Sequence, residues 1–302
     1  MLSTKPQNSY TSRVKLQIIA NPKAGHGRGL ENIERLKRLL RLQALDYEIL
    51  ETTAAGEATE IARDLAKKER DRIIVLGGDG TISEVVNGVL GTTIELGMIC
   101  VGTGNDIARS LGIPYNNLKA SLGVILAGRT KMVDIGMEVD RCFVSALGIG
   151  LAANIAARVN KMKTLKGPTS FFVAAYQATV ALESLPLCLT LDSKKMEVEC
   201  VAVLIQNSCY CGGGLLLAPQ ASMTDGLLDV VVVEKISRTE LMFNFPRIYQ
   251  GKHLGHPKFR IYQAKNISIE SLTKVDKMFD GDLFGKTPVR ARIAESSVRM
   301  VV

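Results

Sequence analysis

The sequence predicts an α/β fold: an N-terminal domain built on a doubly wound parallel sheet, followed by a second domain that is mainly antiparallel β. Strand and helix patterns alternate over residues 13–130, which is typical of a parallel sheet with helices on both faces. Over residues 131–293 the apolar runs become shorter, alternate with polar residues and are separated by glycines, which indicates antiparallel strands. The last segment, about residues 294–302, is expected to return to the first domain.

Four buried strands are expected in the first domain, each followed by a helix. The strands are the apolar runs at residues 15–20, 47–52, 73–76 and 96–101. Helices are expected at residues 30–45 and 57–68, after the glycine-rich turn that follows residue 76, and at residues 118–126. Apolar residues recur at helical spacing; in the third helix they are Val85, Val86 and Val89.

Shorter strand patterns follow in the second domain. They fall at residues 133–139, 142–148, 188–193, 196–207, 227–234 and 259–271. One helix, at about residues 169–183, is expected to interrupt them. The strand-like residues 298–302 are those expected to return to the first sheet.

The composition is that of a soluble globular protein. The chain has 302 residues, 46% of them hydrophobic and 23% charged, a length that accommodates two domains. Its apolar runs fall short of the roughly 18 residues needed to cross a bilayer, and its polar first residues do not resemble a secretion signal. We therefore expect a cytoplasmic protein. Six cysteines without a CxxC pair, and only three histidines, argue against a zinc site.

A net charge of +8 favours an anionic partner. Nucleic acid is not expected, because the chain has no tryptophan and only 5% aromatic residues with which to stack bases. The basic segment 158–166 beside the apolar run 171–182 is compatible with peripheral contact with an anionic membrane surface. A solvated helix face beside a core helix explains the same pattern, and the sequence leaves both interpretations open.

The strand at residues 73–76 ends in the turn GGDGT, residues 77–81. A strand, a glycine-rich turn and a helix present bare backbone N–H groups to phosphate. Gly77, Gly78 and Gly80 permit close backbone approach, which a Cβ atom would obstruct. Asp79 would repel phosphate unless a cation lies between them, so the turn suggests a nucleotide polyphosphate carrying Mg²⁺. An ordinary glycine-rich turn is the alternative.

Two further polar turns follow strands of the same predicted sheet. NPKAG (residues 21–25) leaves the first strand, and GTGND (residues 102–106) leaves the fourth. Because the carboxyl ends of parallel strands meet at one edge of the sheet, the three turns are expected to converge on a single crevice.

These turns, together with TDGLLD (residues 224–229) and FDGD (residues 279–282), resemble the diacylglycerol kinase catalytic family. The similarity is closest to its soluble bacterial members, the DagK-like and YegS/BmrU-like lipid kinases, and extends over about residues 15–293. The resemblance implies transfer of the γ-phosphate of ATP to the hydroxyl of a lipid alcohol. Diacylglycerol, giving phosphatidic acid, is the leading acceptor; monoacylglycerol, phosphatidylglycerol and sphingoid bases are the alternatives.

The resemblance also implies roles for particular residues. The nucleotide would be bound by Asn21, Pro22, Lys23, Ala24, Gly25, Thr52, Gly77, Gly78, Asp79, Gly80, Thr81, Ile82, Ser83, Thr103 and Asp106. Among these, Asp79 and Asp106 would organise Mg²⁺ through water. A second metal site would fall at Asp225, with the backbone carbonyls of Ser222 and Leu227.

The catalytic base of this family lies in a DGE motif, which corresponds here to Asp280, Gly281 and Asp282. The final acid is one methylene shorter in this chain. Either the loop compensates and Asp282 is the base, or Asp280 takes that role.

Other functions remain open at this level. The chain lacks the P-loop motif GxxxxGK[ST] and the HRD and DFG motifs of protein kinases. An NAD kinase shares a GGDGT turn, and a nucleotide- or lipid-binding module without catalysis is compatible with the change from DGE to DGD. Whether the chain forms a homodimer is not predicted by the sequence.

Overall fold

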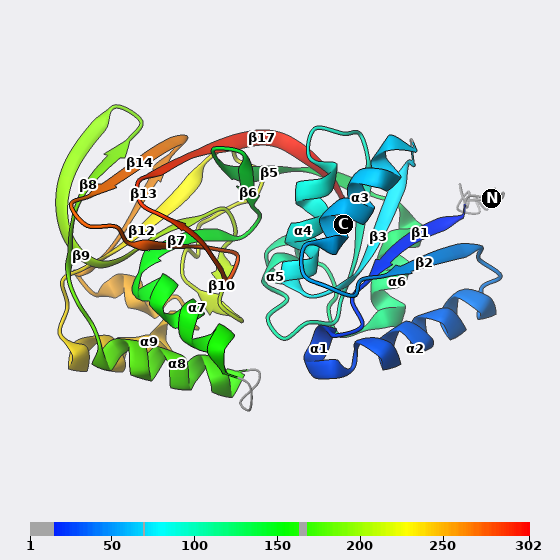
Figure 1. The fold of residues 1–302 in the computed structure, drawn as a ribbon, viewed down its shortest axis with the longest axis horizontal. Helices are drawn as coiled ribbons and strands as arrows, with labels where there is room; N and C mark the ends of the chain where they lie inside the picture. Colours follow the sequence, from blue (N-terminus) through cyan, green and yellow to red (C-terminus); the bar gives the residue numbers. More distant parts are fainter. Residues whose placement is uncertain (1–14, 69, 163–167) are drawn as a thin grey trace, which may run out of the picture.

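The computed structural model describes residues 15–68, 70–162 and 168–302. The N-terminal part is a parallel sheet in the order β2, β1, β3, β4 (Figure 1). Its strands are β1 (Leu16–Ala20), β2 (Tyr47–Glu51), β3 (Arg72–Gly77) and β4 (Glu95–Cys100), and each is parallel to its neighbour. The predicted parallel sheet is therefore confirmed.

Helices cover both faces of this sheet, as a doubly wound fold requires. Its helices are α1 (Ala24–Gly27), α2 (Gly29–Leu42), α3 (Glu57–Lys67), α4 (Asp79–Val89), α5 (Asp106–Leu111) and α6 (Leu118–Ala127). Apolar residues of α2 and α6 share one buried cluster with Ile18 and Ile74. Those of α3 and α4 share another with Ile19 and Val75, the alternate residues of the same two strands.

The C-terminal part is antiparallel. Its central strands are β7 (Ala146–Gly150), β8 (Leu185–Leu191), β9 (Lys194–Gln206), β12 (Leu228–Glu234), β13 (Phe259–Ala264) and β14 (Asn266–Ser271). The hairpin β15 (Asp276–Phe279) and β16 (Asp282–Lys286) extends the sheet beyond β7, and β10 (Tyr210–Cys211) pairs with β11 (Leu215–Leu216). Each of these described pairs is antiparallel, which confirms the predicted class.

Two long strands connect the parts. β5 (Thr130–Glu138) leaves the first part and pairs with the short β6 (Arg141–Phe143) and with β17 (Val289–Val301), along the top of Figure 1. β17 continues back to the first sheet, where Arg299 and Met300 pair in parallel with Glu95 and Leu96 of β4. The two parts thus share one continuous hydrogen-bonded sheet.

The prediction of a single helix in the C-terminal part was wrong. That part contains α7 (Leu151–Lys161), α8 (Pro168–Val180), α9 (Arg238–Ile248) and the 3₁₀ helix η1 (Lys252–Gly255). β7 passes directly into α7, whose N-cap is Gly150 rather than a Ser, Thr, Asp or Asn residue, so the sequence carries only a weak signal for the start of the helix. Pro246 lies inside α9 and argues against a helix there. The capping box formed by Ser237 and Glu240 is nevertheless a sequence signal for the start of α9.

None of the described helices is long and apolar enough to cross a membrane. All six cysteines are free, and Cys100, Cys142, Cys200 and Cys211 are buried.

Candidate active site

The three glycine-containing turns of the first sheet meet at one edge, as predicted. The side-chain amide of Asn21, just after β1, donates to the hydroxyl of Thr81 at 3.0 Å. A Cβ atom on Gly25 would lie 2.4 Å from the carbonyl oxygen of Val101, and one on Gly102 would lie 2.6 Å from the Cα of Gly78. Backbone thus packs directly on backbone, which explains why the turns are rich in glycine.

Gly102→Ala tests this packing. Because its methyl group would meet the backbone of Gly78, the turns after β3 and β4 must separate. We expect at least a tenfold loss of ATP affinity and a lower Tm, measured by calorimetry. Gly123→Ala in α6 is the matched control, since its methyl group meets no atom within 4 Å. Unchanged ATP binding by Gly102→Ala would show that the contact between the turns is unimportant.

Asp79 begins α4 but reaches across to the next turn. Its Oδ1 accepts the backbone N–H of Ile107 at 3.1 Å and so caps the short helix α5. Burial raises the pKa of the Asp79 carboxyl, the charge of Asp280 raises it further, and backbone N–H groups of the α5 turn oppose both effects. A half-buried carboxylate therefore lies among turns suited to phosphate.

Asp106, the first residue of α5, is the second acid of the site, and its side chain is buried. Its Oδ2 accepts the N–H of Gly213 at 2.7 Å, so the glycine-rich bend 212–214 closes over the site. Its Oδ1 is buried without a hydrogen-bond partner among the described residues. Burial, and next the charge of Asp79, raise the pKa of Asp106 to about 6.

These observations test whether a divalent cation fits. Two carboxylates that repel one another, one of them buried with an unpartnered oxygen, are suited to a cation. In the described part of the chain, no group of three or more His, Cys, Asp or Glu residues could hold a metal alone. Mg²⁺ commonly keeps several waters and uses only one or two carboxylates, so Asp79 and Asp106 fit a water-mediated site shared with a polyphosphate.

Asn105 shapes the turn between these two acids, a role the sequence did not suggest. It is fully buried with φ +54°, a conformation that asparagine tolerates better than most residues. Its side-chain oxygen accepts the N–H of Gly102 at 2.9 Å, and its amide donates to the carbonyl of Gly102 at 3.0 Å. Arg109 Nε adds a bond to the carbonyl of Gly104 at 3.1 Å.

The DGD motif is a tight hairpin turn between β15 and β16. Asp280 and Gly281 have φ values of +47° and +100°, and Phe279 pairs with Asp282 across the turn. This turn carries one acid into the protein and leaves the other at the surface.

The carboxylate of Asp280 holds the two parts of the protein together. Its Oδ1 accepts the backbone N–H groups of Ser145 at 2.8 Å and Ala146 at 2.9 Å. Its Oδ2 accepts the N–H of Val144 at 2.8 Å and the hydroxyl of Ser83, in α4, at 2.5 Å. Burial raises the pKa of Asp280, and the four donors oppose that effect. The hydroxyl of Ser83, expected near phosphate, is therefore engaged with Asp280.

Asp282 is exposed, and among the described residues its carboxylate has one weak donor. The side-chain amide of Asn160, near the end of α7, lies 3.4 Å from Asp282 Oδ1 and 3.3 Å from the carbonyl of Gly281. Asn160 is a site residue that the sequence did not reveal, because α7 was not predicted.

A cavity of about 460 Å³ joins these acids to the interior of the C-terminal part. Its polar end is lined by Asp79, Gly80, Thr103, Gly104, Asp106, Ser145, Asp280, Gly281 and Asp282. Its apolar walls come from the inner faces of α7, α8 and α9 and from the facing strands, among them Ile155, Phe171, Leu204, Val233, Leu241 and Phe259. One compartment therefore has an acidic end and a hydrocarbon-lined interior.

Other predicted nucleotide residues lie outside this cavity. Lys23 is exposed, and its Nζ donates to the carbonyl of Thr53 at 3.0 Å. Thr52 is buried after β2, where its N–H donates to the carbonyl of Ala20 at 2.9 Å. The Ile82 side chain is buried in the core. Any role of Ile82 in phosphate binding would fall to its backbone.

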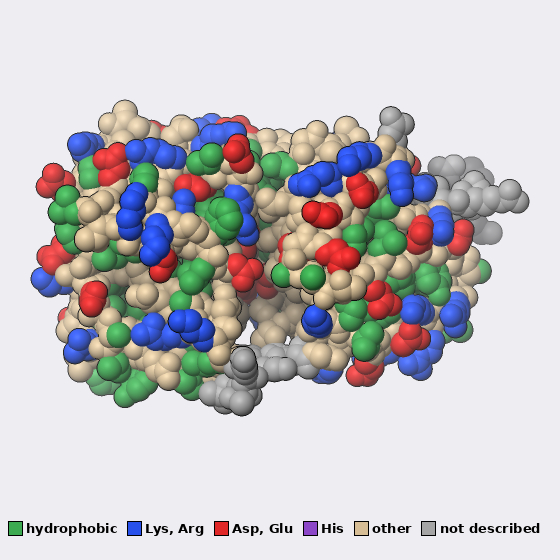
Figure 2. All heavy atoms as spheres, in the orientation of Figure 1, with side chains coloured by type: hydrophobic (Ala, Val, Ile, Leu, Met, Phe, Trp, Pro, Cys, Tyr) green, Lys and Arg blue, Asp and Glu red, His purple; other side chains and the backbone are tan. Residues whose placement is uncertain are grey.

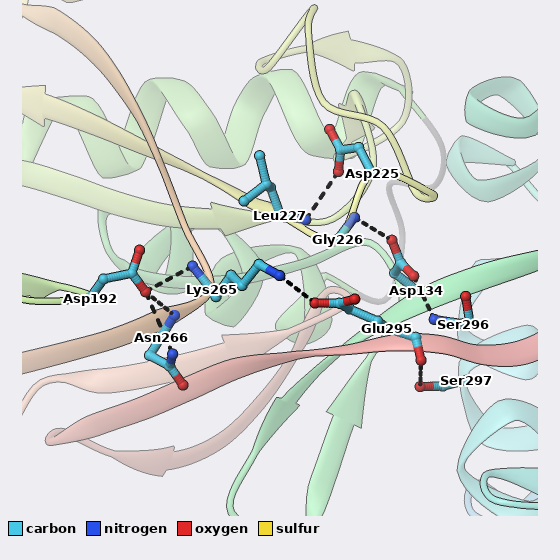
Figure 3. A network of polar contacts seen from close by, with 10 residues as sticks. All are labelled: Asp134, Asp192, Asp225, Gly226, Leu227, Lys265, Asn266, Glu295, Ser296 and Ser297. Carbon is cyan, nitrogen blue, oxygen red and sulfur yellow. Dashed lines mark hydrogen bonds and ion pairs between the residues drawn. The ribbon is translucent and has the colours of Figure 1, made fainter.

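The predicted second metal site is a separate turn before β12 (Figure 3). Asp225 is exposed, and its Oδ1 accepts the N–H of Leu227 at 3.1 Å. The buried Asp134 anchors this turn by accepting the N–H of Gly226 at 2.8 Å, and it also accepts the N–H of Ser296 in β17 at 2.6 Å. The described residues that line the cavity do not include Ser222, Asp225 or Leu227. The metal-binding role of these three residues stays a prediction.

Comparison with known proteins covers both parts of the chain. The family model described as the diacylglycerol kinase catalytic domain matches residues 15–137. The model described as the YegS C-terminal NAD kinase beta sandwich-like domain matches residues 145–302.

Curated relatives named diacylglycerol kinase include proteins of Mycobacterium tuberculosis and Staphylococcus aureus. The first is 28% identical over 95% of this chain and 94% of its own length. The second is 31% identical over 91% of this chain and 88% of its own length. A crystal structure of a diacylglycerol kinase from Bacillus anthracis is 29% identical, with a TM-score of 0.74 over 95% of this chain and 96% of that one. The chain therefore belongs to the diacylglycerol kinase family of phosphotransferases.

Proposed function

We propose that this protein transfers the γ-phosphate of ATP to the hydroxyl of a lipid alcohol, with diacylglycerol as the acceptor and phosphatidic acid as the product. The observation that carries the proposal is one cavity that joins a group of carboxylates to apolar walls. Phosphoryl transfer requires both substrates at one point, and here the polar turns and the apolar interior open onto the same space.

The apolar interior favours a lipid over NAD⁺ as the acceptor. The whole cavity has a volume of about 460 Å³, within the roughly 300–1,000 Å³ typical of small-molecule sites. Ile155, Leu204 and Phe259 would gain from burying hydrocarbon, whereas the polar groups of a dinucleotide would be left without partners there.

Ala202→Phe tests the acceptor site. Ala202 lies in β9, is buried and lines the cavity, so a phenyl ring would occupy space proposed for an acyl chain. We expect kcat/KM for long-chain diacylglycerol to fall at least tenfold while the KM for ATP changes less than twofold. An equal loss for ATP, or none for the lipid, would contradict an acyl site in this cavity.

The donor phosphates are proposed to lie against the three turns. Backbone N–H groups at the start of α4 and in the glycine-rich turns can stabilise negative charge. Asp79 and Asp106 would hold a divalent cation through water, and the cation would neutralise part of the polyphosphate charge. Asn21 and Thr81 fix the turns relative to each other, so these donors are oriented before ATP binds.

Asp282 is proposed as the base that takes the proton of the acceptor alcohol. A carboxylate offers about four acceptor positions, and those of Asp280 are matched by four donors. Asp282 lines the cavity and keeps acceptor capacity beyond its contact with Asn160. Asp280 is accordingly proposed as a positioning residue that joins α4 to the start of β7.

The direct test is incubation with labelled ATP, Mg²⁺ and a total lipid extract, followed by identification of the labelled product. Labelled phosphatidic acid supports the proposal; labelled lysophosphatidic acid or sphingoid phosphate would redirect it to another acceptor. Labelled NADP⁺ from added NAD⁺ would indicate an NAD kinase. No ATP consumption with any lipid alcohol would favour a binding module.

A further inference from the structure

The helix α8 has an unusual surface. Its thirteen residues, PTSFFVAAYQATV, include no charged side chain. Phe172, Tyr176 and Val180 follow one another at intervals of four, so they lie along one face of the helix. They are 46%, 56% and 54% exposed. An exposed helix face usually carries charged residues, so this stripe requires a specific explanation.

The neighbouring helix α9 extends the stripe. Phe243 is 81% exposed and Met242 is 41% exposed. The two helices are packed together, because the ring of Phe172 lies 6.3 Å from that of Phe245 and 5.8 Å from that of Tyr249. They lie side by side along the lower edge of Figure 1, and Figure 2 shows hydrophobic side chains along that edge. We call Phe172, Tyr176, Val180, Met242 and Phe243 the α8–α9 face.

The opposite sides of the same two helices line the cavity. Phe171 of α8 and Leu241, Phe245 and Ile248 of α9 belong to its walls, as does Tyr249 just after α9. The α8–α9 face is thus separated from the proposed acyl site by a single layer of helices. A lipid leaving a bilayer against this face would have little water to cross.

The charges of the three helices that line the cavity have one predominant sign, and exposed Glu183, just beyond α8, is a further acid nearby. The described residues of α7, α8 and α9 include four cationic side chains, Arg158, Lys161, Arg238 and Arg247. The acidic side chain among them is Glu240, which is engaged in the capping box with Ser237. An apolar stripe flanked by cations complements the surface of a bilayer that contains anionic lipid.

We propose that the α8–α9 face docks on an anionic bilayer and that the acceptor lipid enters the cavity from there. Exposed aromatic side chains insert among the acyl chains, and the flanking Arg and Lys side chains contact anionic headgroups. This inference rests on the proposed lipid kinase function, but it concerns how the substrate is reached rather than which reaction takes place.

The test compares binding with chemistry in one variant. Tyr176→Ser combined with Phe243→Ser removes two exposed rings outside the catalytic machinery. We expect at least a tenfold loss of co-sedimentation with vesicles of phosphatidylglycerol and phosphatidylcholine, and a similar loss of activity on long-chain diacylglycerol in those vesicles. Activity on a monomeric, water-soluble short-chain diacylglycerol should be unchanged. Wild-type binding to pure phosphatidylcholine vesicles should be weaker than to the mixed vesicles.

Val139→Ser is the matched control, since Val139 is 67% exposed and belongs to the turn between β5 and β6. In Figure 1 those two strands lie near the upper edge, away from α8 and α9. The proposal is overturned if the double variant binds mixed vesicles as the wild type does, or if the wild type binds none. A wild-type dimer that the double variant converts to a monomer would instead assign the face to a second copy of the chain. Loss of activity on the short-chain acceptor would contradict a docking role. Absence of wild-type activity on that acceptor would count against the proposed function, while the vesicle measurements would still decide the docking.

Discussion

Asp282→Asn is expected to lower kcat for lipid phosphorylation by about 10²–10⁴-fold and to leave the Kd for Mg-ATP unchanged, because the amide keeps the shape of the side chain but cannot accept a proton. Asp282 is exposed at the start of β16, so the substitution should not alter the Tm. Single-turnover kinetics at saturating ATP would measure the chemical step, and calorimetry would measure nucleotide binding.

Asp280 provides the contrast. Replacing it with asparagine directs an amide N–H₂ toward groups that are themselves donors, in a site that is partly buried. Disrupting such a site costs about 3 kcal/mol, so Asp280→Asn should lower the Tm markedly. Ser83→Ala removes one donor at a cost of about 1–2 kcal/mol and should remain folded.

The two acids exchange roles if the results are reversed. Full activity of Asp282→Asn, together with a well-folded but inactive Asp280→Asn, would make Asp280 the base. Ser83→Ala adds a second criterion, because a positioning role predicts a lower kcat for the lipid together with near-normal ATP binding.

The convergence of the three turns was predictable, whereas the connections between them were not. Parallel strands necessarily bring the residues after β1, β3 and β4 to one edge of the sheet. By contrast, the hydrogen bond from Ser83 to Asp280 joins residues 197 positions apart, and neither the GGDGT turn nor the DGD motif predicts it. Sequence motifs identify what a turn can do, but only tertiary packing decides which donor meets which acceptor.

The DGD motif illustrates the same limit. A shorter acid at position 282 suggested a misplaced carboxylate, but its surroundings were unknown because α7 was not predicted. In the structure Asn160 of α7 lies beside Asp282 and the carbonyl of Gly281. Strand patterning carried the prediction of the sheets, while the helices that close over the cavity gave weaker signals.

Asp106→Asn is expected to stabilise the metal-free protein while abolishing Mg-ATP binding. Burial raises the pKa of Asp106 to about 6, above the ordinary value of 3.8. The stability that its proton contributes is present below about pH 3.8 and lost as pH rises through about 6. At neutral pH the folded protein must hold an unfavourable charge, which corresponds to about 3 kcal/mol. An asparagine keeps an oxygen for the N–H of Gly213 without that charge.

Thermal unfolding in EDTA at pH 7.5 should therefore show a Tm several degrees above that of the wild type, and the difference should vanish near pH 4. Asp64→Asn, at a side chain 65% exposed, is the control and should change the Tm by less than about 1 °C. Adding Mg-ATP should raise the Tm of the wild type but not of Asp106→Asn, because a ligand stabilises only the state that binds it. If Asp106→Asn has a lower Tm than the wild type in EDTA, the Asp106 carboxylate stabilises the fold. If the variant binds Mg-ATP normally, Asp106 does not belong to the proposed nucleotide site.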